Sequence, residues 1–533
     1  MDGRGSIAPA VSSGLMTAKN DARQVDDGTG GADPKYAELR RRLVEVSDIG
    51  AASAVLSWDQ TTYMPPGGSG ARGRQLATLG RLAHERFTDD AIGHLLDDLR
   101  PYEESLSPQS DEASLIRVTR RDYEKAVRVP ASFVAEDRAH GAASYDAWVA
   151  ARPANDFRAV QPFLEKTLDL SLQYAGFFPG YAHVADPLID DSDPGVTAAE
   201  VRRVFDELRG HLVPLVRAIT GQLVADDACL RQHYPEQAQW AAGVEAIRLF
   251  GYDFERGRQD KSAHPYTTRF AHGDVRITTR VNEHDLRECL FATLHEAGHG
   301  LYEQGVAPPL DATPLGSGAS SGVHESQSRL WENRVGRSRG FWTFFYPRLQ
   351  SHFPAQLGSV PLDTFYRAIN KVERSLIRVE ADEVTYNLHI MIRFGLELDL
   401  LEGGLAVKDL PEAWNERYRS DLGITPPDDR DGVLQDVHWY TGRIGGLFQG
   451  YTLGNILGAQ FFDAAVAEQP DIPAQIERGE LNSLLTWLQE RLYRHGRKLT
   501  TPELVEGITG GPLRSEPLVR YLTRKYGELY ELG

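Results

Sequence analysis

The sequence predicts a mainly α-helical fold with one small β-sheet. Apolar residues recur at helical spacing in several parts of the chain, and the segment 365–400 is long, helix-compatible and free of proline. Convincing strand patterns are few. The best covers residues 274–281, where Val275, Ile277 and Thr279 alternate with Arg and Thr. With no internal repeat and no glycine-rich phosphate loop after a strand, we expect one mostly helical domain with a small sheet near residue 275.

The ordered part of the chain is expected to begin at Asp33. An Asp N-cap followed by a proline at the first helical position is a good helix start signal. Residues 1–33 are rich in Gly, Ser, Ala and Asp and have no apolar period. Their composition predicts a flexible N-terminal extension, with an interaction arm as the alternative. Residues 34–533 are expected to form a single large domain.

Three further helices are expected along this domain. The sequence Thr197-Ala198-Ala199-Glu200 has the spacing of a capping box and opens an apolar stripe at helical spacing. Residues 445–467 are apolar but contain Gln, Asn and Asp, so they predict a buried helix and not a membrane span. Residues 515–532 show the helical pattern again, after a proline.

The composition limits the possible functions. The 533 residues carry a formal net charge of −18. A protein with this overall negative charge repels nucleic acids and anionic membranes, so neither is an expected partner. The two cysteines, Cys229 and Cys289, exclude a disulfide framework and fit a reducing compartment. No apolar run is long enough for a membrane span, and no secretory signal is visible. A cytoplasmic enzyme is therefore expected.

One helical segment carries a pattern that predicts metal chemistry. His295 and His299 are four residues apart, so on a helix their rings project from one face and can hold one Zn²⁺. Glu296 lies beside them and is the natural general base for a metal-bound water. Asp285 can cap this helix and Gly305 can end it. By chance alone the same pattern would be surface His and Glu residues on a solvated face.

A hydrolytic zinc site needs a third protein ligand and one open position. Glu325 lies 26 residues after His299, which leaves room for a loop and a second helix that returns antiparallel, with Glu325 in its first turn. His324 and Glu332 are rival ligands. Spacing favours Glu325 only slightly and leaves all three open.

Several short motifs occur along the chain in addition to the histidine pair. They are HEAGH at 295–299 with LYEQG at 301–305, HESQS at 324–328, WDQ at 58–60 with YMPPG at 63–67, HP at 264–265, DxRxT at 274–278, IRxxAD at 377–382 and GxxQDxHW at 432–439. Together they resemble the carboxypeptidase Taq family of zinc metallocarboxypeptidases, from about residue 36 to the C-terminus. The motifs occur in the family's order, which makes the set highly specific, although each alone is weak.

The resemblance implies a mainly helical catalytic domain with a deep active-site groove, one zinc ion at its base and a homodimer. By similarity the metal ligands are His295, His299 and Glu325, and Glu296 is the general base and acid. Cobalt remains a possible substitute for zinc, because a His₂Glu set accepts several divalent ions.

A carboxypeptidase must also bind the free terminal carboxylate of its substrate, which a guanidinium does through two parallel hydrogen bonds. Arg378, in the IRxxAD match, is the candidate. Without the resemblance, an ion pair with Asp382 one helical turn away would be the more natural role. Arg276, in the DxRxT match, is the reserve candidate and more plausibly shapes the groove wall.

The reaction also needs a donor for the oxyanion that forms on the scissile carbonyl. His438 and Tyr451 are the candidates. The alternatives are a core histidine beside Trp439 and a tyrosine that only packs. Asp436 is expected to orient His438 or a zinc-bound histidine.

These residues predict a zinc-dependent carboxypeptidase that releases single C-terminal amino acids from peptides. No pocket residue stands out as a selector, so broad specificity is expected. A zinc endopeptidase or dipeptidyl carboxypeptidase with the same core is one alternative, and a non-catalytic peptide-binding or scaffolding protein on a peptidase fold is another.

Overall fold

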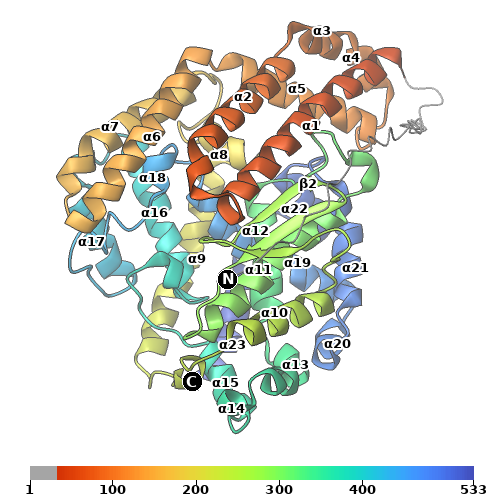
Figure 1. Cartoon of the computed structure of the whole chain (residues 1–533). Helices are drawn as coiled ribbons and strands as arrows, with labels where there is room; N and C mark the ends of the chain where they lie inside the picture. Colours follow the sequence, from red (N-terminus) through yellow and green to blue (C-terminus); the bar gives the residue numbers. More distant parts are fainter. Residues whose placement is uncertain (1–32, 533) are drawn as a thin grey trace, which may run out of the picture.

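The computed structural model describes residues 33–532 and confirms a mainly α-helical fold with one small sheet (Figure 1). The predicted extension at 1–33 lies outside the described residues, apart from Asp33. The helices are α1 (Pro34–Thr62), α2 (Ser69–Phe87), α3 (Asp90–Asp98), α4 (Arg100–Ser105), α5 (Asp111–Arg128), α6 (Ala131–Ala154), α7 (Phe157–Gly176), α8 (Asp186–Ser192), α9 (Ala198–Thr220), α10 (Glu236–Phe250), α11 (Leu286–Gly305), α12 (Ser321–Arg329), α13 (Arg339–His352), α14 (Pro354–Leu357), α15 (Leu362–Ile369), α16 (Thr385–Leu401), α17 (Leu410–Asp421), α18 (His438–Thr441), α19 (Phe448–Glu468), α20 (Ile472–Arg478), α21 (Asn482–Arg491), α22 (Thr501–Thr509) and α23 (Glu516–Leu529). The strands are β1 (Gln259–Lys261), β2 (Thr267–Ala271) and β3 (Asp274–Thr279).

The predicted helix starts are confirmed. The Asp33 carboxylate accepts a hydrogen bond from the Lys35 N–H at 2.7 Å, so α1 begins at the expected cap. A complete capping box between Thr197 and Glu200 opens α9. The apolar segment at 445–467 becomes the buried helix α19. No helix in the described part of the chain is both long enough and apolar enough to cross a membrane.

The small sheet confirms the predicted strand and gives α11 a surface to pack on. The strand order is β1-β3-β2, with β1 parallel and β2 antiparallel to β3. Val275 and Ile277 are fully buried on β3, as their alternation predicts. Figure 1 shows α1 and α2 on the side of the sheet away from the C-terminal helices.

Helices α11, α12 and α19 form the centre of the fold, and glycines allow their close approach. A Cβ atom on Gly298 of α11 would lie 2.6 Å from the Gln327 carbonyl oxygen and from the Ser328 Cα of α12. A Cβ atom on Gly454 of α19 would lie 2.4 Å from the Glu325 Cγ. Larger residues at these positions would push α12 away from its neighbours. The backbone that carries Glu325 is therefore held between two helices.

The expectation of one long helix over 365–400 is wrong. Helix α15 ends at Ile369, and α16 begins only at Thr385. Asp382 caps α16, because its Oδ1 accepts the backbone N–H groups of Val384 and Thr385 at 2.9 and 3.0 Å. The backbone N–H of Arg378 donates to Gln435 Oε1 at 3.0 Å. These contacts, one of them from a distant segment, outweigh the helix propensity of the stretch between the two helices.

Candidate metal centre

Helix α11 brings two histidines to one face, as predicted. The Asp285 side chain accepts a hydrogen bond from the Arg287 N–H at 2.9 Å and caps the helix, which ends at Gly305. The ring centroids of His295 and His299 lie 4.9 Å apart. Both rings are partly exposed on a helix that is otherwise mostly buried, so they face an accessible space.

Glu325 of α12 lies opposite these two rings. Its Oε2 is 3.7 Å from His295 Nε2 and 3.5 Å from His299 Nε2. The three side chains each offer a ligand atom within 4.8 Å of the other two. Glu325 is the fifth residue of α12, one position beyond the predicted first turn. The structure thus brings the three predicted ligands together.

The two rival ligands lie behind the histidines instead. His295 Nδ1 contacts Glu332 Oε2 at 3.0 Å. His299 Nδ1 contacts His324 Nδ1 at 2.6 Å, and His324 Nε2 contacts Glu303 Oε1 at 2.7 Å. The arrangement consistent with these contacts is a relay in which His299 donates to His324 and His324 donates to Glu303. The Nε2 lone pairs of His295 and His299 then face Glu325. A histidine that binds a metal ion needs its lone pair in this orientation.

Arg329 completes the support of Glu325. Its Nε donates to Glu325 Oε1 at 2.7 Å, which leaves Oε2 facing the histidines. Burial opposes ionisation of Glu325, but Arg329 and the two histidines outweigh it and hold its pKa below the ordinary value. Burial lowers the pKa of His299 to about 4, so this ring is neutral at pH 7. The donor set and its hydrogen bonds fit a divalent metal ion with histidine and carboxylate ligands.

A short irregular segment contains Glu332, the partner of His295. Residues 330–335 form a π-helix directly after α12. This wider turn rotates the following side chains relative to a regular helix, and such turns are frequent at functional sites. Glu332 lies within this turn, seven residues after Glu325, and its Oε2 contacts His295 Nδ1. The Glu325–Arg329 pair, at i and i+4, and the Arg329–Glu332 pair, at i and i+3, are the supporting contacts that helical spacing could have indicated.

Glu296 lies one residue after His295 and is 6% exposed. Thr267 Oγ1, on β2, donates to Glu296 Oε2 at 2.8 Å. Burial raises the pKa of Glu296 above its ordinary value. Thr267 could not be predicted from the sequence, because its contact with Glu296 depends on how the sheet packs against α11.

The histidine relay gives a test of the metal centre. Replacing His324 with leucine should weaken metal binding by about ten- to a hundredfold, because the imidazole that fixes the His299 ring is lost. Competition with a chelating dye measures this affinity. His352→Leu is a matched control, since His352 contacts Glu245 at 2.9 Å and forms no hydrogen bond with His295, His299 or Glu325. An unchanged affinity in His324→Leu would contradict the relay.

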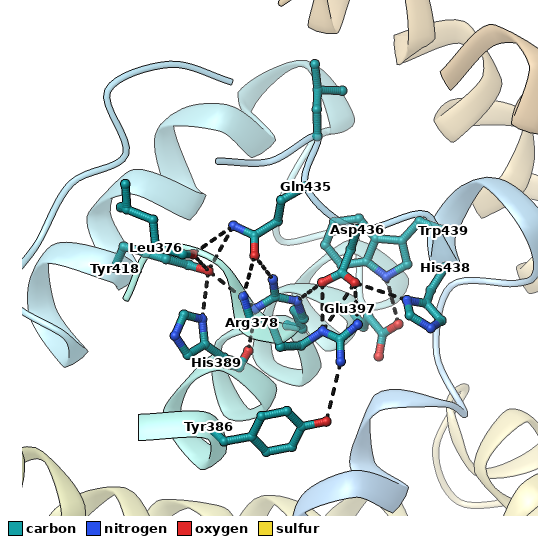
Figure 2. A network of polar contacts seen from close by, with 12 residues as sticks. Leu376, Arg378, Tyr386, His389, Glu397, Tyr418, Gln435, Asp436, His438 and Trp439 are labelled. Atoms are coloured by element: carbon teal, nitrogen blue, oxygen red, sulfur yellow. Dashed lines mark hydrogen bonds and ion pairs between the residues drawn. The ribbon is translucent and has the colours of Figure 1, made fainter. Parts of the chain in front are cut away.

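The predicted substrate residue Arg378 lies in a buried cluster (Figure 2). Arg378 does not pair with Asp382, although the sequence without the family resemblance suggested that ion pair. Its Nη2 donates to Asp436 Oδ1 at 2.6 Å and its Nε to Asp436 Oδ2 at 3.0 Å. Its Nη1 lies 3.4 Å from the Tyr386 hydroxyl. Asp436 also contacts His438 Nδ1 at 3.1 Å, so it orients that ring as expected.

The remaining predicted residues lie in two places. Tyr451, in the first turn of α19, places its ring 5.5 Å from the Arg378 guanidinium and 6.4 Å from the His438 ring. Arg276 belongs to a different group. Its guanidinium is held by Asp274 at 2.7 and 2.8 Å and lies over the rings of Trp58 and Phe270, at 4.4 and 4.9 Å. The structure brings Arg378, His438 and Tyr451 together, while Arg276 attaches α1 to the sheet.

A buried carboxyl beside this cluster gives a second test. Glu397 Oε1 accepts hydrogen bonds from Trp439 Nε1 at 2.8 Å and from the Gly445 N–H at 3.1 Å. Burial raises its pKa from 4.5 to about 7. The unfolded chain therefore ionises first as the pH rises, and ionisation favours unfolding. As the pH rises from 4.5 to about 7, ionisation of Glu397 should lower the free energy of unfolding by roughly 3 kcal/mol.

Replacing Glu397 with glutamine should remove this loss. We expect the difference in unfolding temperature, variant minus wild type, to be more positive at pH 8 than at pH 5. Thermal unfolding followed by circular dichroism at both pH values measures it. Equal differences at the two pH values would show that Glu397 titrates normally.

Comparisons with known proteins agree with this geometry. Residues 38–526 match the family model described as Carboxypeptidase Taq (M32) metallopeptidase. A relative from Thermus thermophilus, named thermostable carboxypeptidase 1, is 42% identical over 503 residues, with 92% of this chain and 98% of the relative covered. Carboxypeptidase 1 of Bacillus subtilis is 36% identical, with 93% and 98% covered.

A solved structure leads to the same family. The M32 carboxypeptidase from Deinococcus radiodurans R1 superposes with a TM-score of 0.91 at 50% identity, with 94% of this chain and 100% of that chain covered. The chain therefore belongs to the carboxypeptidase Taq (M32) family and is a metallocarboxypeptidase, an enzyme that uses a metal ion and acts on peptides.

Proposed function

We propose that this protein is a zinc-dependent carboxypeptidase that releases single C-terminal amino acids from peptides with broad specificity. The observation that carries the proposal is the convergence of His295, His299 and Glu325 beside Glu296. A divalent ion held by these three ligands would supply a Lewis acid that activates water and stabilises negative charge on the scissile carbonyl oxygen. Zinc is the metal best suited to this ligand set, with cobalt as a possible substitute.

Glu296 is proposed as the general base and then the general acid. Thr267 occupies its Oε2, while Oε1 has no hydrogen-bond partner among the described residues. The free oxygen can take a proton from the attacking water and pass it to the departing amine. The raised pKa of Glu296 brings the carboxyl closer to the pH at which it both accepts and returns a proton.

Tyr451 and His438 are proposed as donors to the oxyanion. Burial raises the pKa of Tyr451, so its hydroxyl keeps its proton at neutral pH. Among the described residues, neither this hydroxyl nor His438 Nε2 has a hydrogen-bond partner, whereas His438 Nδ1 contacts Asp436. Both groups are therefore available to a substrate carbonyl oxygen.

Arg378 is proposed as the receptor of the terminal carboxylate, with Arg276 as a residue of the groove wall. Arg378 and Arg393 are both buried, and within the described residues Asp436 is the one carboxylate that pairs with either. Two buried positive charges on one negative charge are unfavourable without a further anion. The substrate carboxylate supplies that anion, which supports exopeptidase over endopeptidase activity.

The peptide products test this proposal. Mass spectrometry of a peptide digested over time should show successive losses of one residue from the C-terminus. The same peptide with an amidated C-terminus should be cleaved far more slowly. Equal cleavage of the two peptides would indicate an endopeptidase, losses of two residues a dipeptidyl carboxypeptidase, and no cleavage by metal-loaded protein a non-catalytic peptide-binding protein.

We also propose a homodimer, a cytoplasmic location and a single catalytic domain over residues 34–533 with a deep groove above the metal centre. The family resemblance supports the dimer and the groove. Both cysteines are free thiols, in keeping with a reducing compartment.

A further inference from the structure

Arg393 is a fully buried arginine that no motif includes and that has no assigned role of its own in the proposed mechanism. It lies in the middle of α16, with a side chain that is 0% exposed. Its Nε donates to Asp436 Oδ2, its Nη2 donates to Gln435 Oε1 at 2.8 Å and its Nη1 donates to the His389 carbonyl oxygen at 2.8 Å. The guanidinium lies 4.6 Å from the Trp414 ring. All three nitrogens are thus fixed, and none can reach a substrate.

Two side chains, Asp436 and Gln435, join Arg393 to the residues proposed to face the substrate. Figure 2 shows both of them beside Arg378. Asp436 Oδ2 accepts a hydrogen bond from Arg393, and Asp436 Oδ1 contacts His438. Arg378 donates to both oxygens of Asp436. Gln435 Oε1 accepts hydrogen bonds from Arg393 Nη2 and from the backbone N–H of Arg378. Two of the residues that hold Arg378, Asp436 and Gln435, are therefore shared with Arg393.

The charges explain why a second arginine matters. If Arg378 were the sole cation on Asp436, the two charges would cancel and Arg378 would attract a further carboxylate weakly. With Arg393 present, two guanidinium groups share one carboxylate. The cluster then keeps about one unit of positive charge, and in a buried site this charge acts strongly on an incoming anion.

We propose that Arg393 is a positioning residue for substrate binding. It acts through Asp436 and Gln435, which it holds in the orientation that directs Arg378 and His438 toward the substrate. It also keeps the cluster positive for the terminal carboxylate. This inference rests on the proposed function, because it assumes that Arg378 binds that carboxylate.

Steady-state kinetics on an N-blocked peptide with a free C-terminus tests the inference in the metal-loaded enzyme. Arg393→Gln removes the charge and loosens Asp436, so it should raise KM about tenfold, whereas kcat should fall less, through the weaker support of His438. Arg393→Lys keeps the charge but cannot hold Asp436 and Gln435 together. Its KM should therefore lie between the KM of the wild type and that of Arg393→Gln. A merely structural role would lower the unfolding temperature without this rise in KM.

Arg417 offers a matched control. It joins α17 to α16 through an ion pair with Asp399 and contacts no residue of the cluster. Arg417→Gln should leave KM unchanged. If Arg393 acts through Asp436, adding Arg393→Gln to an Asp436→Asn enzyme should raise KM by much less than it does in the wild type.

A parallel Arg378→Lys enzyme separates the two proposals. If Arg378→Lys raises KM and folded Arg393 variants do not, the role of Arg393 is wrong and the proposed function stands. If Arg378→Lys leaves KM unchanged, the assignment of Arg378 fails, and the inference fails with it. Where Arg393→Gln does not fold, Arg393→Lys decides: an increased KM supports the inference, and an unchanged KM overturns it.

Discussion

Replacing Glu296 with glutamine is expected to abolish peptide hydrolysis while the metal ion stays bound. Glutamine has nearly the same shape and can still accept the hydrogen bond that Thr267 donates at 2.8 Å. It cannot take a proton from water or return one to the leaving amine. General acid and base catalysis contributes about 10²–10⁴-fold to rate, and Glu296 performs both steps, so we expect kcat to fall by at least about 10³-fold.

Two measurements check this expectation. The turnover of a blocked peptide gives kcat, and elemental mass spectrometry gives the metal content of the same preparation. Glu288→Gln is a matched control, because Glu288 is a glutamate in the first turn of the same helix and pairs with Arg280 at 2.9 Å. A Glu296→Gln enzyme that hydrolyses peptides normally would show that another group moves the proton.

Replacing Glu325 with glutamine is expected to remove both the metal ion and the activity. The neutral amide loses the charge that Glu325 contributes beside His295 and His299. Loss of a group that merely holds a ligand costs about ten- to a hundredfold in affinity, so loss of a ligand should cost more than a hundredfold. Arg329 keeps its contact with Glu332 at 3.2 Å, which limits the damage to the fold.

The metal content of purified Glu325→Gln protein, compared with wild type, measures the effect. In the wild type, a strong chelator should remove activity and added zinc should restore it, whereas the variant should not recover. Glu383→Gln is the matched control, because Glu383 forms a buried ion pair with Lys525 at 2.6 Å away from the centre. That variant should be less stable but retain its metal. A Glu325→Gln protein with full metal content would exclude Glu325 as a ligand.

The sequence predicted the parts of the site that depend on one helix. Two of the three candidate ligands and Glu296 occur within five residues of α11, where helical geometry alone fixes their relative positions. The position of Glu325 depends instead on the packing of α12 between α11 and α19. Spacing therefore left Glu325 open against His324 and Glu332, and the π-helical turn that contains Glu332 had no visible signal in the sequence.

Contacts between distant segments account for what the sequence did not predict. Arg378 and Asp436 are 58 residues apart, so no local pattern could pair them, and the nearer Asp382 was the natural alternative. The same contacts interrupt the expected helix at 365–400, because the Arg378 backbone bonds to Gln435. The role of Arg393 could not be predicted for a related reason. A buried arginine within an apolar helix is recognisable only once its partners are known.

Anomalous diffraction at the zinc absorption edge, from crystals of the zinc-loaded enzyme, tests the central claim most directly. The account predicts one strong peak per chain within about 2.0–2.2 Å of His295 Nε2, His299 Nε2 and Glu325 Oε2. A peak elsewhere, or a peak bound by His324 or Glu332 in place of Glu325, would contradict it.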